Sequence, residues 1–281
     1  MSRLLSNLTL QVEPTTACNL DCAICMRRNL QRAVTSLSVD SFKRILDSGS
    51  FRHVGLHGWG EPLLNRGLFE MVAYAESRGV LTNLTTNGTL VRGNVDRIFD
   101  SGLREIAFGV YDRELFLRSA SYVEGLIRER KRRGLTKPRV YLDITVYEGN
   151  SGEVLDLVSL AEELQADAAI LHRLFNAHSV DPSMKYIARD EEEELFAGVR
   201  QLAKALKLKV YLPPRHSYPC RVVRSCVFVT VEGKVTPCCF LPDLCLGDAL
   251  EDGVEKVMRS KAYYSFVKDM KKHPICSRCE W

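Results

Sequence analysis

The first residues with a type and spacing suited to chemistry are three cysteines in the stretch CNLDCAIC. Cys18, Cys22 and Cys25 follow the spacing C-x3-C-x2-C, which is one ligand short of a closed tetrahedral metal site. Thiolates at short spacing hold zinc or an iron–sulfur cluster. A zinc site would take His53 or His57 as its fourth ligand. We favour a four-iron cluster in which cysteine binds three irons and the fourth iron is open to a substrate or cofactor.

The composition is that of an ordinary globular protein. Of 281 residues, 46% are hydrophobic and 26% are charged, and the formal net charge is only +4, which argues against a nucleic-acid partner. The first residues lack the apolar centre of a signal peptide, and no window has the ~18 apolar residues of a membrane span. We therefore expect a cytoplasmic location without membrane contact, where clustered cysteines bind metal.

The elements that must position these cysteines alternate along the chain. Apolar, β-rich runs are separated by amphipathic helical stretches, and three of these stretches close with a glycine, Gly49, Gly79 or Gly102. The pattern predicts an α/β fold, a partial (βα)6 TIM-type barrel over residues 1–212. The predicted strands are 8–12, 53–58, 81–87, 105–111, 139–147 and 168–175, and the predicted helices are 38–49, 67–79, 95–102, 115–133, 153–165 and 190–207.

The pattern changes after a turn-rich linker that begins at residue 213. Residues 225–240 predict a β-hairpin, and residues 254–271 predict one helix. This second module, 213–281, contains seven of the ten cysteines. Such a concentration predicts a second metal centre.

CNLDCAIC resembles the CX3CX2C signature of the radical S-adenosylmethionine (radical SAM) superfamily. The resemblance implies a [4Fe–4S] cluster whose open iron is chelated by S-adenosylmethionine. One electron then cleaves the cofactor to a 5′-deoxyadenosyl radical, which abstracts hydrogen from the substrate.

Two further segments resemble the same family. HGWGEPLL (57–64) is similar to its GGEP segment, with Trp59 in place of the first glycine, and TTNG (85–88) is similar to its TNG segment. Ile24 stands where the family usually has an aromatic residue, so backbone contacts near the adenine are expected there. The residues implied for S-adenosylmethionine binding are Ile24, Trp59, Gly60, Glu61, Thr86 and Asn87.

The tail resembles the SPASM/twitch extension of that superfamily. Cys220, Gly233 and Cys238 follow its C-x(9–15)-G-x4-C pattern, and Cys276 and Cys279 resemble its closing pair. The resemblance implies one auxiliary [4Fe–4S] cluster on these four cysteines. Cys226 is the rival of Cys220, and a zinc ribbon on the same four cysteines is the alternative reading.

A fully ligated auxiliary cluster favours net oxidation, because it can accept the electron that a substrate radical leaves. We expect dehydrogenation or oxidative bond formation on a small molecule or metal-cofactor precursor, with a reductase such as ferredoxin or flavodoxin as electron donor. A peptide presented by a separate partner and an iron–sulfur electron-transfer protein are the alternatives. Candidate catalytic residues at strand ends are His172, Arg173 and Tyr111, and His57, Asp112 and Tyr147 are further candidates for substrate contact.

Overall fold

The computed structural model describes residues 8–176, 178, 181 and 183–281, so the first seven residues, inspected above for a signal peptide, lie outside it. A ten-stranded sheet with the order β10-β9-β8-β1-β2-β3-β4-β5-β6-β7 forms its centre. The predicted α/β class with a mostly parallel sheet is confirmed. The six predicted strands are present as β1 (Thr9–Val12), β2 (His53–Leu56), β3 (Leu81–Thr86), β4 (Glu105–Val110), β5 (Arg139–Val146) and β6 (Ala168–Arg173). A short seventh parallel strand, β7 (Val210–Tyr211), was not predicted because two residues carry no periodic signal.

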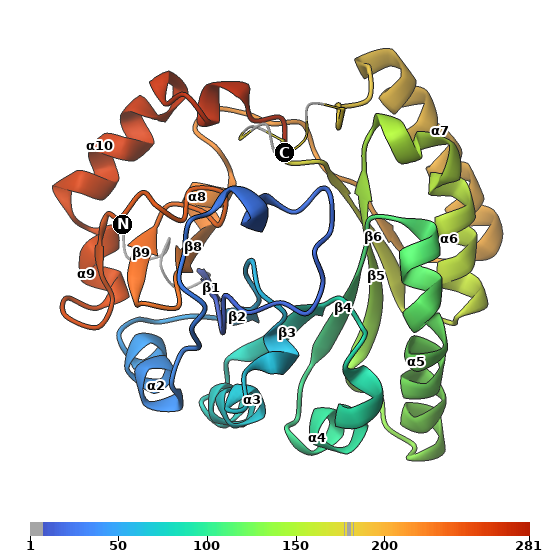
Figure 1. The fold of residues 1–281 in the computed structure, drawn as a ribbon, viewed down its shortest axis with the longest axis horizontal. Coiled ribbons are helices and arrows are strands. Elements are labelled where there is room, and N and C mark those ends of the chain that lie inside the picture. The colour runs from blue at the N-terminus through green and yellow to red at the C-terminus, as the bar shows by residue number, and fades with distance from the viewer. Residues whose placement is uncertain (1–7, 177, 179–180, 182) are drawn as a thin grey trace.

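The connecting helices lie along the outer side of the curved sheet (Figure 1). Each buries an apolar face, as Phe42 and Ile45 do for the helix after β1. Gly79 and Gly102 adopt the left-handed conformation expected after a helix, whereas Gly49 does not, and Ser48 ends that helix instead. The helices are α2 (Val39–Asp47), α3 (Leu68–Ser77), α4 (Val95–Asp100), α5 (Arg113–Arg132), α6 (Val154–Glu163) and α7 (Arg189–Leu206).

The tail is joined to this sheet by strand pairing. Its strand β8 (Cys226–Val229) pairs with β1 in parallel, Leu10 opposite Val227, and with β9 (Lys234–Thr236) as the predicted antiparallel hairpin. A two-residue strand, β10 (Gly247–Asp248), completes that edge of the sheet. Strand β1 is therefore flanked by β2 on one side and by the tail on the other, and the division at residues 212 and 213 stays a prediction.

The tail's helical part differs from the single predicted helix. It is divided into α9 (Val254–Met258) and α10 (Lys261–Asp269), preceded in the chain by the short α8 (Val222–Ser225). Ser260 has an extended backbone and its hydroxyl accepts a 3.2 Å hydrogen bond from Tyr263 N, so it caps a new helix at that point. Among the described residues, no helix has the length and apolar character to cross a bilayer.

Candidate functional site

The three N-terminal cysteines lie in the loop that follows β1, at the carboxyl edge of the parallel strands. Cys25 N donates a 3.0 Å hydrogen bond to Cys22 O and begins a 3-10 turn, Met26–Asn29. Burial, together with the neighbouring Cys25 and Cys18, raises the pKa of Cys22 to about 11. The structure thus brings the three predicted thiols together. All three line a cavity of about 510 Å³.

His53, one fourth ligand considered for zinc, lies away from this loop. It begins β2 and pairs with Thr9 at the amino ends of the two parallel strands, whereas the cysteine loop follows their carboxyl ends. Where the chain is described, no group of three or more Cys, His, Asp or Glu side chains is arranged to hold a single metal ion.

Glu61 connects the two other predicted segments. It is 2% exposed, and its carboxylate accepts hydrogen bonds from Thr86 Oγ1 at 2.7 Å, Asn87 N at 2.8 Å and Leu63 N at 3.1 Å. Burial raises its pKa, while these hydrogen bonds oppose the shift. The carboxylate therefore fixes the loop after β2 against the loop after β3.

Asn87 extends this arrangement to the cysteine loop. Its Nδ2 donates to Asn19 Oδ1 at 3.0 Å and lies 4.0 Å from Cys18 Sγ. Its Oδ1 accepts from Thr89 N at 3.0 Å, which sets the side-chain amide in this orientation. A polar side chain of the TTNG segment is thus held beside the first thiol.

Trp59 and Gly60 form the turn between the cysteine loop and the tail. A Cβ on Gly60 would lie 2.1 Å from Thr15 O, so this position requires glycine. Trp59 Nε1 donates to Cys239 O at 2.8 Å, so the residue that replaces the family's glycine binds the tail. Trp59, Gly60 and Ile24 all line the cavity with the cysteines.

His172 forms a pair with Asp143 across two strands of the cavity wall. Asp143 on β5 lies opposite Ile170, and Thr145 lies opposite His172, so the two side chains are diagonal neighbours. His172 Nε2 is 3.0 Å from Asp143 Oδ1. Burial alone would lower the pKa of His172, but the negative charge of the nearby Asp143 raises the pKa above its ordinary value.

Arg173, the other member of the predicted catalytic pair, has a different environment. Arg173 follows His172 on β6, and both residues contribute to the lining of the main cavity. The Arg173 guanidinium binds Glu192 at 2.5 and 2.8 Å and donates to Pro214 O at 2.7 Å. The structure therefore holds the Arg173 guanidinium in an ion pair with α7 at the edge of the cavity that His172 also lines.

The remaining strand-end candidates divide into two groups. Tyr111 and His57 line the cavity. Burial and the negative charge of Asp143 raise the pKa of Tyr111. Burial lowers the pKa of His57 to about 4. Asp112 caps α5, accepting from Leu115 N at 2.7 Å, and Tyr147 N donates to Asn150 Oδ1 at 2.9 Å in a turn. Tyr111 and His57 are therefore placed to contact a bound molecule.

Four tail cysteines form the second thiol group. Cys220, Cys238 and Cys276 pack in one small cluster with the buried side chains of Val223, Leu241 and Met270. Burial, and then Cys279 and Cys220, raise the pKa of Cys276 to about 11, which places Cys279 within the same group. These are the four cysteines predicted from the tail pattern.

Of the other tail cysteines, Cys239 adjoins that group and Cys226 adjoins Cys239. Cys226 begins β8, and its thiol is directed to Val227 O at 3.8 Å, with Cys239 as its thiol neighbour. Cys239 lines the main cavity and Cys245 is exposed. This placement favours Cys220 over Cys226 as the fourth ligand of the tail.

Two features of the site were missed from the sequence. The first is Asp143. The sequence signal that could have identified it is a carboxylate inside the apolar run RVYLDITV. The other is Glu13, fully buried after β1, which binds Arg32 at 2.7 Å and accepts from Val231 N at 3.2 Å. Arg32 also binds Glu232 at 2.8 Å. This network attaches the cysteine loop to the tail hairpin, and no local pattern pairs residues so far apart.

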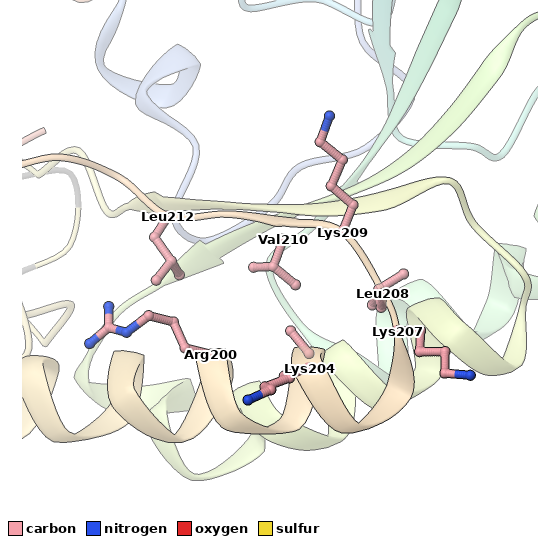
Figure 2. Close-up of a pocket in the computed structure, with 8 residues that line it drawn as sticks. Arg200, Lys204, Lys207, Leu208, Lys209, Val210 and Leu212 are labelled. Carbon is pink, nitrogen blue, oxygen red and sulfur yellow. The ribbon is translucent and has the colours of Figure 1, made fainter.

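A groove of about 460 Å³ between α7 and β7 is separate from these residues (Figure 2). Val210 and Leu212 point toward α7, which contributes Arg200 and Lys204. The described residues that line the groove include no carboxylate, no thiol and no predicted site residue. We assign it no part in the chemistry.

Two family models match the chain at the two cysteine groups. The model of the Radical SAM superfamily matches residues 12–114, and that of SPASM, an iron–sulfur cluster-binding domain, matches residues 220–280.

Similar proteins of known name cover most of the chain. A tungsten-containing aldehyde ferredoxin oxidoreductase cofactor-modifying protein of Pyrococcus furiosus is 23% identical, with 82% of this chain and 70% of that protein covered. A PqqA peptide cyclase of Rhizobium meliloti is 25% identical, with 100% of this chain and 81% of that protein covered. Among solved structures, Streptococcus suis SuiB bound to S-adenosylmethionine has a TM-score of 0.79 at 16% identity, covering 94% of this chain and 68% of that one. The last likeness concerns the fold alone.

Proposed function

This chain belongs to the radical SAM superfamily and carries a SPASM iron–sulfur domain, and on that premise we propose that it oxidises a small molecule or a metal-cofactor precursor. The observation that carries the proposal is the shared cavity. The three thiols after β1, the Asp143–His172 pair and the tail residue Cys239 all line it. Radical generation and proton removal can therefore act on one bound molecule. We also propose that the six βα units around this cavity form a partial barrel.

The two thiol groups fit the two clusters of the family. A [4Fe–4S] cluster that binds S-adenosylmethionine and an auxiliary cluster are the cofactors of a radical SAM protein with this domain. We assign Cys18, Cys22 and Cys25 to the first cluster. Cys220, Cys238, Cys276 and Cys279 are assigned to the second. When bound, the clusters supply the electron that cleaves S-adenosylmethionine to a 5′-deoxyadenosyl radical and an acceptor for the electron left on the substrate.

The loops after β2 and β3 position S-adenosylmethionine beside the three thiols. Glu61 holds these loops together through Thr86 and the backbone of Asn87, so the binding surface is formed in advance. The Asn87 amide lies at the thiols, and Trp59, Gly60 and Ile24 form the adjacent wall. A preformed wall of this kind keeps water from a reactive intermediate.

His172 accepts the proton that oxidation releases. Removal of hydrogen from a carbon that bears a hydroxyl or amine leaves a proton for a base to take. Asp143 stabilises the imidazolium that forms, because opposite charges at 3.0 Å favour the charged state. Tyr111 faces the same cavity and contributes a hydrogen bond to the substrate. Arg173 acts as a positioning residue, since its ion pair with Glu192 fixes the end of β6.

The test is anaerobic reconstitution followed by reduction with S-adenosylmethionine present. We expect about eight irons per chain, from two four-iron clusters, and formation of 5′-deoxyadenosine. The exposed Cys245→Ala variant is the control and keeps both. A chain with both clusters but no cleavage would favour an electron-transfer protein, and an iron-free chain would refute the proposal.

A peptide substrate is the second candidate function. The relative from Rhizobium meliloti, named as a peptide cyclase, covers the whole chain and supports it. The relative from Pyrococcus furiosus, named as cofactor-modifying, supports the first proposal. Mass shifts in a peptide encoded beside this chain would favour the second candidate. For either reaction we propose a cytoplasmic location and a ferredoxin or flavodoxin as electron donor.

A further inference from the structure

A second cavity of about 250 Å³ adjoins the main cavity. The end of β7, the linker residues 213–217 and the first residues of the tail form its walls. Ile170, His172 and Trp281 line both cavities, so these three side chains form the partition. His172 and Trp281 are stacked there, with ring centroids 5.4 Å apart and planes at 19°. A molecule that extends past this partition would occupy both spaces.

Two arginine side chains contribute to the wall of the second cavity. Arg215 and Arg221 line it together with Cys220, and its described lining residues include no Asp or Glu side chain. Arg215 is paired with Glu193 outside the cavity. Arg221 makes no ion pair or side-chain hydrogen bond within the part of the chain that the structure describes. Two arginines in the wall of one cavity, of which only Arg215 has an ion-pair partner, are suited to binding an oxyanion.

The walls are held in place without a ligand. Arg173 donates to Pro214 O at 2.7 Å while its buried ion pair with Glu192 fixes it to α7. His216 packs edge-on against Tyr218 at 4.7 Å. The linker is therefore ordered by contacts of its own, and the cost of ordering a binding site is already met before binding.

We propose that this second cavity is a subsite for the oxyanion of the substrate, a carboxylate or a phosphate. The reacting carbon then lies in the main cavity beside His172, and the oxyanion lies past Trp281, on Arg221 and Arg215. This inference rests on the proposed function, and it narrows the substrate to a molecule with an anionic group at one end.

The experiment measures binding of inorganic phosphate, and separately of acetate, to the reconstituted full-length chain by anaerobic calorimetry. We expect wild type to bind at least one of them, and Arg221→Gln to weaken that binding by about 10-fold or more. Tighter binding of phosphate or of acetate tells which oxyanion the cavity prefers. Arg224→Gln is the matched control, because Arg224 is exposed on α8, three residues after Arg221, and lines neither cavity.

Two checks keep the result interpretable. If Arg221→Gln changes the iron content, Arg215→Gln, farther along the chain from Cys220, replaces it as the test variant. Absence of binding, or equal losses in Arg221→Gln and Arg224→Gln, would overturn the proposal. Phosphate binding needs no cleavage of S-adenosylmethionine. If the protein cleaves S-adenosylmethionine but binds neither phosphate nor acetate, only the subsite is refuted. If it binds an anion through Arg221 but does not cleave S-adenosylmethionine, the proposed function is refuted.

Discussion

The two cysteine groups lie in contrasting surroundings. The first has three thiols in a loop among polar groups such as Asn87, and it opens into the large cavity. The second has four thiols, and apolar side chains such as Val223 and Met270 pack against it. An incomplete set of ligands at the wall of an open cavity suits a cluster that must bind another molecule. A complete set in an apolar environment suits one that only exchanges electrons.

The strongest test of this contrast removes a ligand from the first group. In Cys22→Ala we expect 5′-deoxyadenosine formation to fall by at least about 100-fold, because loss of even an outer-sphere partner costs up to that much at a metal site. Iron should fall by about four per chain while the tail keeps its cluster. Product chromatography and iron assay measure both. Cleavage at the wild-type rate would show that these thiols do not bind the catalytic cluster.

Removing a cysteine of the second group should separate cleavage of S-adenosylmethionine from electron exchange by the auxiliary cluster. In Cys276→Ala we expect a loss of about four irons per chain, but 5′-deoxyadenosine formation within about twofold of wild type. The reason is that the cysteine loop and the loops that surround it are intact in this variant. Parallel loss of cleavage would contradict the division of labour between the two groups.

The charged pair of the cavity can be tested by titration. The pKa of His172 is raised by Asp143, so its imidazolium persists above the pH at which an ordinary histidine loses its proton. In Asp143→Asn that support is lost and burial remains, so we expect the pKa of His172 to drop by about one unit or more. NMR of histidine-labelled protein with oxidised clusters measures the pKa of His172. The signal of His57, the other cavity histidine, is distinguishable because burial lowers its pKa to about 4. A His172 pKa that is unchanged in the variant would refute the pair.

The smallest change in iron content and cleavage is expected for Cys226, the rival of Cys220 as a ligand in the tail. We expect Cys226→Ala to keep about eight irons and to change 5′-deoxyadenosine formation by less than about twofold, whereas Cys220→Ala loses about four irons. Cys226 lies beside Cys239 rather than within the four-thiol group. The opposite pattern in the iron assay would exchange the assignments.

Local patterns account for most of the fold that the sequence predicted. The six predicted strands, the five helices between them and α7 after the sixth strand are present, because apolar period and helix ends are properties of neighbouring residues. The pairing of β8 with β1 was not foreseen, since register between distant segments leaves no periodic signal. Ser260 divided the predicted last helix for a local reason that the apolar pattern concealed.

The site divides in the same way. Cysteine type and spacing identified both thiol groups, because metal ligation depends on residue type and short spacing. The partners of His172 and Arg173 were not identifiable. Asp143 reaches His172 only through the β5–β6 register, and Glu192 reaches Arg173 only because α7 packs beside the strand end.

The pairing of β8 with β1 also has a consequence for how the chain folds. Glu13, next to β1, and Val231, next to β8, are hydrogen-bonded although they lie 218 residues apart in the sequence. During synthesis β1 emerges early and lacks this neighbour until almost the whole chain has been made. Contacts of such long range slow folding and leave a strand edge open meanwhile. We therefore expect truncation before β8 to yield a chain that aggregates rather than a stable fold, because the edge of β1 would stay unpaired.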